Sequence, residues 1–353
     1  MVSQTTKLGG TASDVTVGRV ARARFPLAWL DDDDVEEDFN SWTPNPTPDE
    51  QAFEAIKTGI DALPKGAKMI LNSAEFYAMD MGTGNLQLLN RFFSKYPEYA
   101  DRTFVAVKGG VKDRAPDGSI EVLRASADNI QKALGTVKKL DLFQVARVDR
   151  RVPIEQLVQN LATLVKEGKC SHIGLSECNG DTLRKANAVY PITVAEIEVS
   201  PWSYDFQQKK VIAAATELNI SVFAYSPLGK GFLTGQIKSP EDLAKGDIRG
   251  HMTRFKEENM KHNFALVDGL KAIATKKGIT SAQLCLAWII SLGPTMVPLP
   301  GSSKATRALE NLAAGDIVLT KEELKEISDL LAKHEVKGDR YFGMSDEQLH
   351  LWQ

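Results

Sequence analysis

The strongest constraint on the fold is an alternation of two hydrophobic periods along most of the chain. Short β-branched or aromatic runs predict buried strands, and the stretches between them repeat apolar residues at the i, i+3, i+4, i+7 spacing of amphipathic helices. The predicted strands are residues 15–21, 69–72, 103–107, 141–148, 172–176, 193–199, 220–226 and 295–298. The predicted helices are residues 49–62, 86–94, 123–134, 153–167, 180–189, 207–218 and 264–292, the last divided at Gly278 with a new N-cap at Thr280 or Ser281.

This alternation predicts parallel βαβ units, because parallel strands buried on both faces need helical crossovers. Eight such units close into a (β/α)8 TIM barrel, and we expect a single α/β domain over residues 1–353. A doubly wound open sheet is the alternative, but no G-x-G-x-x-G follows a predicted strand, so a Rossmann site is not indicated. In a barrel, function lies at the C-terminal ends of the strands.

Composition excludes several classes of protein. With 43 basic and 46 acidic residues and 43% hydrophobic residues, the chain is neither disordered nor a nucleic-acid binder acting through gross positive charge. No run approaches the roughly 18 apolar residues of a membrane span, and the first ten residues lack the apolar core of a secretion signal, so we expect a cytoplasmic protein. Neither the three cysteines nor the five histidines have ligand spacing, so we expect no metal.

One segment does not fit the alternation, an acidic stretch within residues 22–41. Seven of the eight residues from Asp31 to Asp38 are acidic. Such a run repels itself and cannot line a packed core, so we expect an exposed insertion. Without these seven, 39 acidic residues stand against 43 basic ones, so the rest of the chain leans slightly basic, which suits an anionic ligand without proving one.

Polar residues follow two neighbouring predicted strands. Residues 72–77 read NSAEFY and residues 107–110 read VKGG, so Tyr77 and Lys108 can converge at the barrel mouth. A tyrosine ordinarily has a pKa near 10, and a neighbouring ammonium lowers that pKa, which eases proton donation to a carbonyl oxygen. Taken alone, such a pair is more often structural.

Two segments near the C-terminus suggest a phosphate-bearing planar ligand. Residues 298–304 read PLPGSSK before a predicted helix, where Gly301 permits close backbone approach, a serine can cap the helix, and Lys304 and Arg307 add positive charge. The alternative is a capped helix with a surface ion pair between Arg307 and Glu310. Residues 223–235 place an aromatic residue at a strand end before a Gly-rich loop, which offers a stacking face and a flexible cover.

Several of these motifs, in this order, resemble the aldo-keto reductases. They are YSPLGKG from Tyr225, LTG from Leu233, PGSSK from Pro300 with Arg307-x-x-Glu-Asn311, and KEGK from Lys166 with IGLS from Ile173. The resemblance runs from about residue 16 to residue 333, interrupted by the acidic insertion. Residues 43–48, 72–77, 107–110, 141–149 and 196–202 look most like the fungal pyridoxal reductases.

The resemblance implies NADPH-dependent reduction of an aldehyde, here pyridoxal to pyridoxine. Tyr77 would be the general acid, with Lys108 lowering its pKa and Asn72 beside them. The residues implied for the nicotinamide, pyrophosphate, 2′-phosphate and adenine are Ser176, Glu196, Tyr225, Ser226, Leu228, Gly231, Gly301, Ser302, Lys304, Arg307, Glu310 and Asn311. Aromatic candidates for the substrate pocket, each of which could instead simply cover the barrel rim, are Trp42, Phe76, Trp202 and Tyr341.

Two residues depart from the general family pattern. Asn72 stands where the family has an aspartate, so we expect Lys108 to lose its counter-ion. Ala146 stands where the family has a histidine, which removes a hydrogen-bond donor to the carbonyl worth up to about 3 kcal/mol. The phenol of pyridoxal, adjacent to its aldehyde, could partly replace that donor.

Alternative functions are a broad-range aldehyde reductase and a low-turnover NADPH-binding sensor or interaction barrel.

Overall fold

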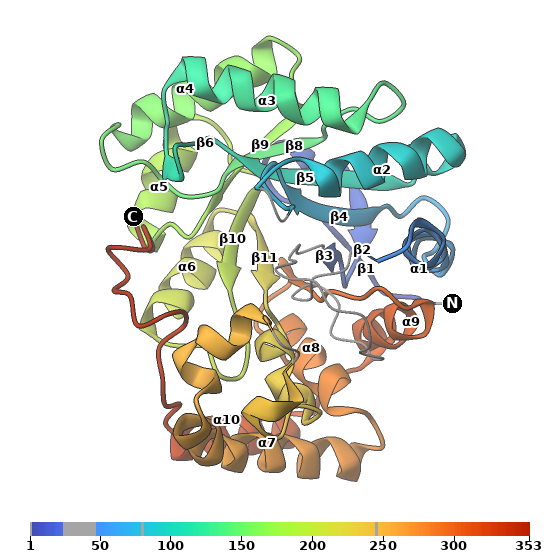
Figure 1. Ribbon diagram of the computed structural model, residues 1–353, viewed down its shortest axis with the longest axis vertical. Coiled ribbons are helices and arrows are strands. Elements are labelled where there is room, and N and C mark those ends of the chain that lie inside the picture. Colours follow the sequence, from blue (N-terminus) through green and yellow to red (C-terminus); the bar gives the residue numbers. More distant parts are fainter. Residues whose placement is uncertain (1, 24–46, 79–80, 244–245) are drawn as a thin grey trace.

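A ring of parallel strands surrounded by helices forms the protein (Figure 1). The computed structural model describes residues 2–23, 47–78, 81–243 and 246–353. Eight strands are hydrogen-bonded in the order β12-β11-β10-β9-β8-β5-β4-β3. Next to the two edge strands, the amide of Ala21 donates to the carbonyl oxygen of Pro298 at 3.0 Å, which joins the ends of the sheet. The predicted α/β barrel is confirmed.

The strands and helices have the following bounds. The barrel strands are β3 (Arg22–Ala23), β4 (Met69–Ala74), β5 (Thr103–Gly109), β8 (Leu142–Val145), β9 (His172–Ser176), β10 (Val194–Glu198), β11 (Ser221–Tyr225) and β12 (Met296–Leu299). The helices are α1 (Asp49–Asp61), α2 (Gly84–Lys95), α3 (Ile120–Leu134), α4 (Ile154–Lys166), α5 (Gly180–Val189), α6 (Phe206–Glu217), α7 (Glu257–Lys277), α8 (Ser281–Ser291), α9 (Ala305–Ala313) and α10 (Lys321–Lys333). Two short antiparallel pairs lie outside the barrel sheet, β1 (Thr5–Lys7) with β2 (Thr16–Gly18) and β6 (Val111–Lys112) with β7 (Ala115–Pro116).

Local sequence explains where the helices lie and end. In α4, Leu157, Leu161 and Leu164 recur on one face and are fully buried against the barrel. The predicted division of the long C-terminal helical pattern is confirmed, because Gly278 ends α7 with a φ of 74° and the Thr280 side chain caps α8. In the described ranges, none of the helices has both the length and the apolar character needed to cross a bilayer.

A second hydrophobic cluster fills the barrel. Phe104, Leu142, Phe223 and Val297, one from each of four strands, pack inside the ring and are at most 2% exposed. Because this interior is packed, the barrel is not a pore, and a ligand must sit at one of its ends.

The start of the barrel differs from the prediction. Residues 15–21 were expected to form the first barrel strand, but Thr16–Gly18 instead pairs antiparallel with Thr5–Lys7. The first barrel strand is Arg22–Ala23, which lies within the predicted acidic insertion and pairs in parallel with β4. A short apolar alternation fits a hairpin strand and a barrel strand equally well, so periodicity could not separate them. Residues 24–41 of the predicted insertion lie outside the described residues.

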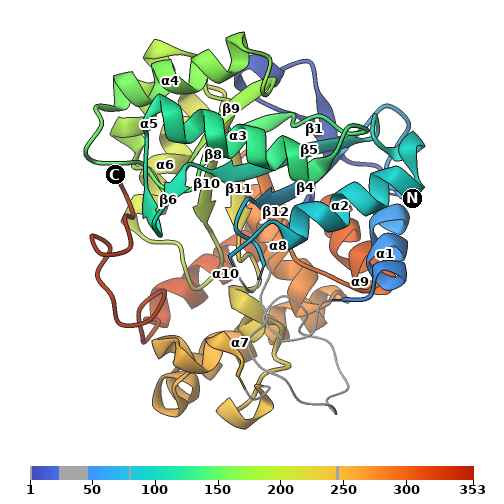
Figure 2. The same ribbon diagram turned by 45° about the horizontal axis from the view of Figure 1, so that its top comes forward.

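The segment after α10 folds back along the barrel as an irregular tail. Figures 1 and 2 show it leaving α10 and ending near α5. The amide of Trp352 donates to the Glu177 carbonyl oxygen at 2.7 Å, and the amide of Asn179 donates to the Gln353 carbonyl oxygen at 3.0 Å. The tail is therefore fastened where β9 ends.

Candidate active site

Three of the predicted site residues meet around one buried ammonium. Lys108, on β5, donates from Nζ to Oδ1 of Asn72 on β4 at 2.9 Å. The same Nζ lies 2.7 Å from Oε1 of Glu196 on β10. Lys108, Asn72 and Glu196 are 4%, 2% and 1% exposed. Side chains from three strands therefore converge inside the barrel, toward the C-terminal ends of the strands.

Tyr77 lies directly above this group. It follows β4 in a turn, where its amide donates to the carbonyl oxygen of Ala74, and Ala74 is the register partner of Lys108. Lys108 Nζ is 5.1 Å from the centroid of the Tyr77 ring. The structure thus brings together the tyrosine and lysine that the sequence places on neighbouring strand ends.

The pKa of Tyr77 moves in the opposite direction from the expectation. Burial raises this pKa well above its ordinary value, the Glu196 carboxylate raises it further, and only the Arg147 guanidinium acts to lower it. The expected lowering by Lys108 is wrong for this structure, since the charge of that lysine is already paired with Glu196. A raised pKa keeps Tyr77 protonated at neutral pH, the form that a proton donor requires.

Glu196 supplies the charge that Lys108 was expected to lack. Burial lowers the pKa of Lys108, and the Glu196 carboxylate opposes that shift through its charge and its hydrogen bond. The second carboxylate oxygen, Oε2, accepts from Asn72 Nδ2 at 2.6 Å and also from Gln144 Nε2. The expectation that Lys108 has no counter-ion is therefore wrong. Sequence reasoning missed Gln144, although an amide within the apolar run of β8 was a usable signal.

Arg147 follows the end of β8 and comes directly after Ala146, the residue that stands where the family pattern has a histidine. Its Nη1 donates to the carbonyl oxygen of Ala146 at 2.6 Å and its Nε to that of Leu349 at 3.3 Å. Burial acts to lower the pKa of Arg147, but Tyr225, Tyr341 and Glu177 outweigh it and raise that pKa. A cation is thus held near Tyr77 and Tyr225 that the sequence did not single out.

The C-terminal tail enters the same end of the barrel. The hydroxyls of Tyr225, at the end of β11, and Tyr341 lie 2.7 Å apart, and Arg340 Nη2 donates to the Tyr225 hydroxyl at 3.0 Å. Arg340 also pairs with Glu177 and with Glu198, each at 2.9 Å. The predicted pocket aromatic Tyr341 and the predicted stacking residue Tyr225 are therefore direct neighbours.

The residues predicted to hold a phosphate surround the start of α9. Helix α9 begins at Ala305 with Lys304 as its N-cap, and no side chain in the described chain caps it. The predicted serine cap is wrong, because Ser302 Oγ instead accepts from the Lys304 amide at 3.2 Å and donates to the Lys304 carbonyl at 2.9 Å. The first-turn amides of α9 thus lie beside Lys304 and Arg307, the arrangement on which the predicted anion site depends.

The remaining predicted cofactor residues lie near the ends of β9 and β11 or on α9. Ser176, register partner of Glu196, has a buried Oγ for which the described residues offer no hydrogen-bond partner. Ser226 and Gly231 have φ angles of 48° and 94°, which give the loop after β11 its sharp turns, with Leu228 between them. On α9, Glu310 accepts from Thr280 Oγ1 at 2.7 Å, and Asn311 is buried.

The other predicted pocket aromatics have different surroundings. Phe76 packs edge-on against Tyr77, with ring centroids 5.6 Å apart. Trp202 is only 3% exposed and stacks on Phe232 at 4.9 Å, as expected of an aromatic that covers the rim. Trp42 lies outside the described residues.

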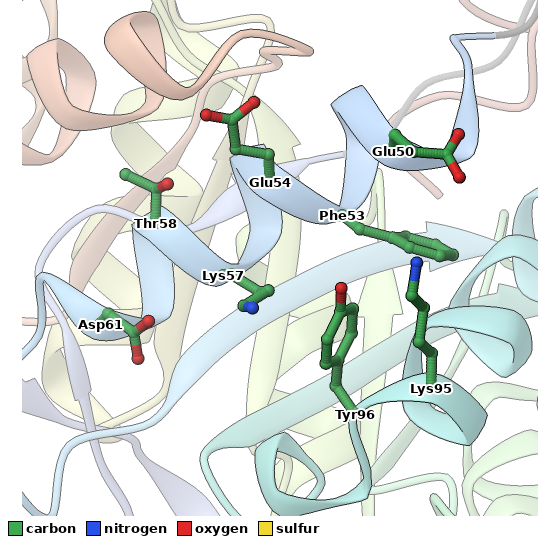
Figure 3. A pocket seen from close by; sticks show the side chains of 8 residues that line it. All are labelled: Glu50, Phe53, Glu54, Lys57, Thr58, Asp61, Lys95 and Tyr96. Carbon is green, nitrogen blue, oxygen red and sulfur yellow. The ribbon is translucent and has the colours of Figure 1, made fainter.

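A separate groove lies on the outside of the barrel, between α1 and the end of α2 (Figure 3). Its lining residues are Glu50, Phe53, Glu54, Lys57, Thr58, Asp61, Lys95 and Tyr96. The groove contains none of the predicted site residues, and its lysines lie over aromatic rings, with Lys57 Nζ 4.2 Å from the Tyr96 centroid.

Comparison with known proteins agrees with this geometry. A solved structure, a glycerol dehydrogenase from Gluconobacter oxydans, superposes with a TM-score of 0.76 over 98% of this chain and 100% of that one, at 22% identity, and so shows the fold alone. The chain is 38% identical over 309 residues to a probable pyridoxal reductase 2 of Schizosaccharomyces pombe, covering 85% of this chain and 91% of that protein. It is 37% identical over 265 residues to the NADP(+) aldo-keto reductase yakc of the same organism, covering 73% and 77%. The model of the Aldo/keto reductase family matches residues 39–332. The chain therefore belongs to the aldo/keto reductase family and is an oxidoreductase.

Proposed function

We propose that this enzyme reduces an aldehyde with NADPH, and that its substrate is pyridoxal, reduced to pyridoxine in the cytoplasm. The observation that carries the proposal is the convergence of Tyr77, Lys108 and Asn72 at the C-terminal end of the barrel. Two of the relatives support it by name, one as a probable pyridoxal reductase and one as an NADP(+) enzyme.

The residues present fit a bound dinucleotide. The buried hydroxyl of Ser176, for which the described residues offer no hydrogen-bond partner, suits an amide group, and the first turn of α9, which no described side chain caps, suits a phosphate. When bound, NADPH supplies the hydride. Residues that would hold it are Ser176, Glu196, Tyr225, Ser226, Leu228, Gly231, Gly301, Ser302, Lys304, Arg307, Glu310 and Asn311.

The chain's own residues would supply the proton that the carbonyl oxygen takes up. Tyr77, protonated at neutral pH, would donate its hydroxyl proton to the carbonyl oxygen of the aldehyde. Lys108, held by Asn72 and Glu196, would stabilise the phenolate that remains. Phe76 and Tyr341 would border the substrate, as would Trp42.

Arg147 gives a reason to favour pyridoxal. The aldehyde of pyridoxal has a phenolic oxygen beside it, and a guanidinium close enough to influence Tyr77 attracts such an oxygen. We expect an aromatic aldehyde without the adjacent hydroxyl, such as pyridine-4-carbaldehyde, to be reduced about 10-fold or more slowly, the value of one charge-assisted hydrogen bond. Equal kcat/KM values for the two aldehydes would remove the basis for this preference.

The proposal is tested by following NADPH oxidation with pyridoxal and a small panel of aldehydes. We expect turnover with the highest kcat/KM for pyridoxal. Comparable efficiency on unrelated aromatic aldehydes would replace the proposal with a broad-range aldehyde reductase. NADPH binding, followed by fluorescence, without turnover of any aldehyde would favour the sensor function.

Cofactor choice should depend on the start of α9. Replacing both Lys304 and Arg307 by alanine removes two cations from the anion site, and charge-assisted hydrogen bonds contribute about 1.5–3 kcal/mol each. We expect the KM for NADPH to rise about 100-fold or more while the KM for NADH changes little, because NADH lacks the 2′-phosphate. Lys325→Ala, an exposed lysine on α10, is the matched control and should leave both values unchanged. A parallel rise in both KM values would contradict a 2′-phosphate site.

A further inference from the structure

The hydrogen bonds around Lys108 define a closed set of four side chains from four strands. Lys108 contacts Asn72 and Glu196, and Glu196 in turn accepts from Asn72 and Gln144. Within the described parts of the chain, Glu196 is the one carboxylate in ion-pair contact with Lys108. The set therefore holds one positive and one negative charge in direct contact, and two neutral amides that donate to the carboxylate.

Burial makes that balance necessary. The side chains of Lys108 and Glu196 are 6% and 1% exposed, so water cannot replace either partner. Removing one member of a buried ion pair leaves an uncompensated charge and is strongly destabilising. The amides of Asn72 and Gln144 both donate to Oε2 of Glu196, which holds the carboxylate in place.

We propose that Glu196 is the counter-ion of the Lys108 ammonium and the residue that positions it under Tyr77. In this role both carboxylate oxygens are engaged inside the barrel, Oε1 by Lys108 and Oε2 by the two amides, whereas the family resemblance assigns Glu196 to the cofactor. The inference deepens the proposed function and rests on it to the extent that Tyr77 and Lys108 are the reacting pair.

The role has a directional consequence for Tyr77. A negative charge near a phenol disfavours the phenolate, and Glu196 raises the pKa of Tyr77 in this structure. Loss of Glu196 removes that effect and leaves the buried ammonium unpaired. In a Glu196→Gln variant, the alkaline limb of the reduction rate should move to lower pH.

A double-mutant cycle, which moves the carboxylate from position 196 to position 72, tests the counter-ion role. Glu196→Gln leaves the ammonium without a carboxylate, and Asn72→Asp sets two carboxylates against one ammonium. We expect each single variant to lower kcat at least 10-fold and to lower the unfolding temperature of the protein without cofactor. The double variant Asn72→Asp with Glu196→Gln again has one carboxylate touching Lys108, from β4 instead of β10, and an amide at position 196 that can donate to it. It should recover most of both losses.

The cycle gives a decision in every case. If the losses in kcat and unfolding temperature add, so that the double variant is worse than either single variant, the proposal is overturned. A Glu196→Gln variant with wild-type kcat, pH profile and unfolding temperature would also overturn it. If Glu196→Gln fails to fold, a folded double variant supports the proposal, and a double variant that fails while Asn72→Asp folds overturns it. Glu335→Gln, an exposed carboxylate paired with Lys337, is the control and should change nothing.

Two further measurements distinguish the counter-ion role of Glu196 from a role in cofactor binding and from a failure of the proposed function. If Glu196 serves mainly to bind the cofactor, Glu196→Gln should change the NADPH dissociation constant, measured by fluorescence titration, and Asn72→Asp should not restore it. If the wild-type chain turns over no aldehyde, the proposed function fails. The unfolding temperatures of the four proteins would still show whether the ion pair follows the cycle.

Discussion

Replacing Tyr77 by phenylalanine is expected to remove almost all aldehyde reduction and little else. The substitution keeps the ring, and with it the edge-on contact with Phe76 and the position over Lys108 Nζ. Only the hydroxyl that would protonate the carbonyl oxygen is lost. A positioned general acid contributes about 10²- to 10⁴-fold to the rate, so kcat should fall by that factor. The measurement is steady-state NADPH oxidation with saturating pyridoxal.

Two comparisons make this result specific. NADPH affinity, measured by fluorescence titration, and the unfolding temperature should stay near the wild-type values, because nothing implied for the cofactor is changed. Tyr96→Phe removes a hydroxyl on the outer surface, in the groove of Figure 3, and should leave kcat unchanged. A Tyr77→Phe variant that keeps more than about a tenth of the wild-type rate would exclude Tyr77 as the proton donor.

The meeting of Tyr77 and Lys108 could be predicted because it depends only on neighbouring parallel strands. Once both runs are recognised as strands, their C-terminal ends share one edge of the sheet, and the register pairs Ala74 with Lys108. The fifth predicted strand, residues 172–176, coincides with β9, because a short apolar run bounded by polar residues is a local signal of a strand.

The partner of Lys108 could not be predicted in this way. Glu196 lies three strands farther along the sheet, on β10, and reaches Lys108 only because the sheet closes into a ring. Sequence spacing identifies which strand ends face one edge, but not which side chains touch across the interior. The position of Arg340 could not be predicted from the sequence either, because residues 334–353 have neither a strand period nor a helix period.

Arg340 ties the tail to two buried carboxylates. Its side chain is 9% exposed and lies 2.9 Å from Glu177 and 2.9 Å from Glu198, and both of these are 0% exposed. Lys230 Nζ also pairs with Glu198, at 2.9 Å. Burial acts to raise the pKa of Glu198, but Lys230, Arg340 and Arg254 outweigh it and lower that pKa to about 2. The ionised carboxylates therefore depend on the cations around them.

Replacing Arg340 by leucine should be strongly destabilising. The change removes one partner from two buried ion pairs, and breaking such a pair costs about 3–5 kcal/mol. We expect the free energy of unfolding, measured by urea denaturation at pH 7, to fall by about that amount. Arg150→Leu is the matched control, because its pair with Glu347 is exposed, 46% and 81%, and is worth about 0–1 kcal/mol. Equal losses in the two variants would contradict a structural role for the buried pairs.

The loss should also depend on pH in one direction. A carboxyl whose pKa is lower in the folded than in the unfolded protein stabilises the fold above its ordinary pKa of 4.5, and that contribution disappears as the pH falls toward about 2. Without Arg340, the pKa values of Glu177 and Glu198 rise, so less of this stabilisation exists at neutral pH. The difference between wild type and Arg340→Leu should therefore be largest near pH 7 and should shrink below about pH 4. A difference that grows on acidification would mean that Arg340 stabilises the fold through packing and not through its charge.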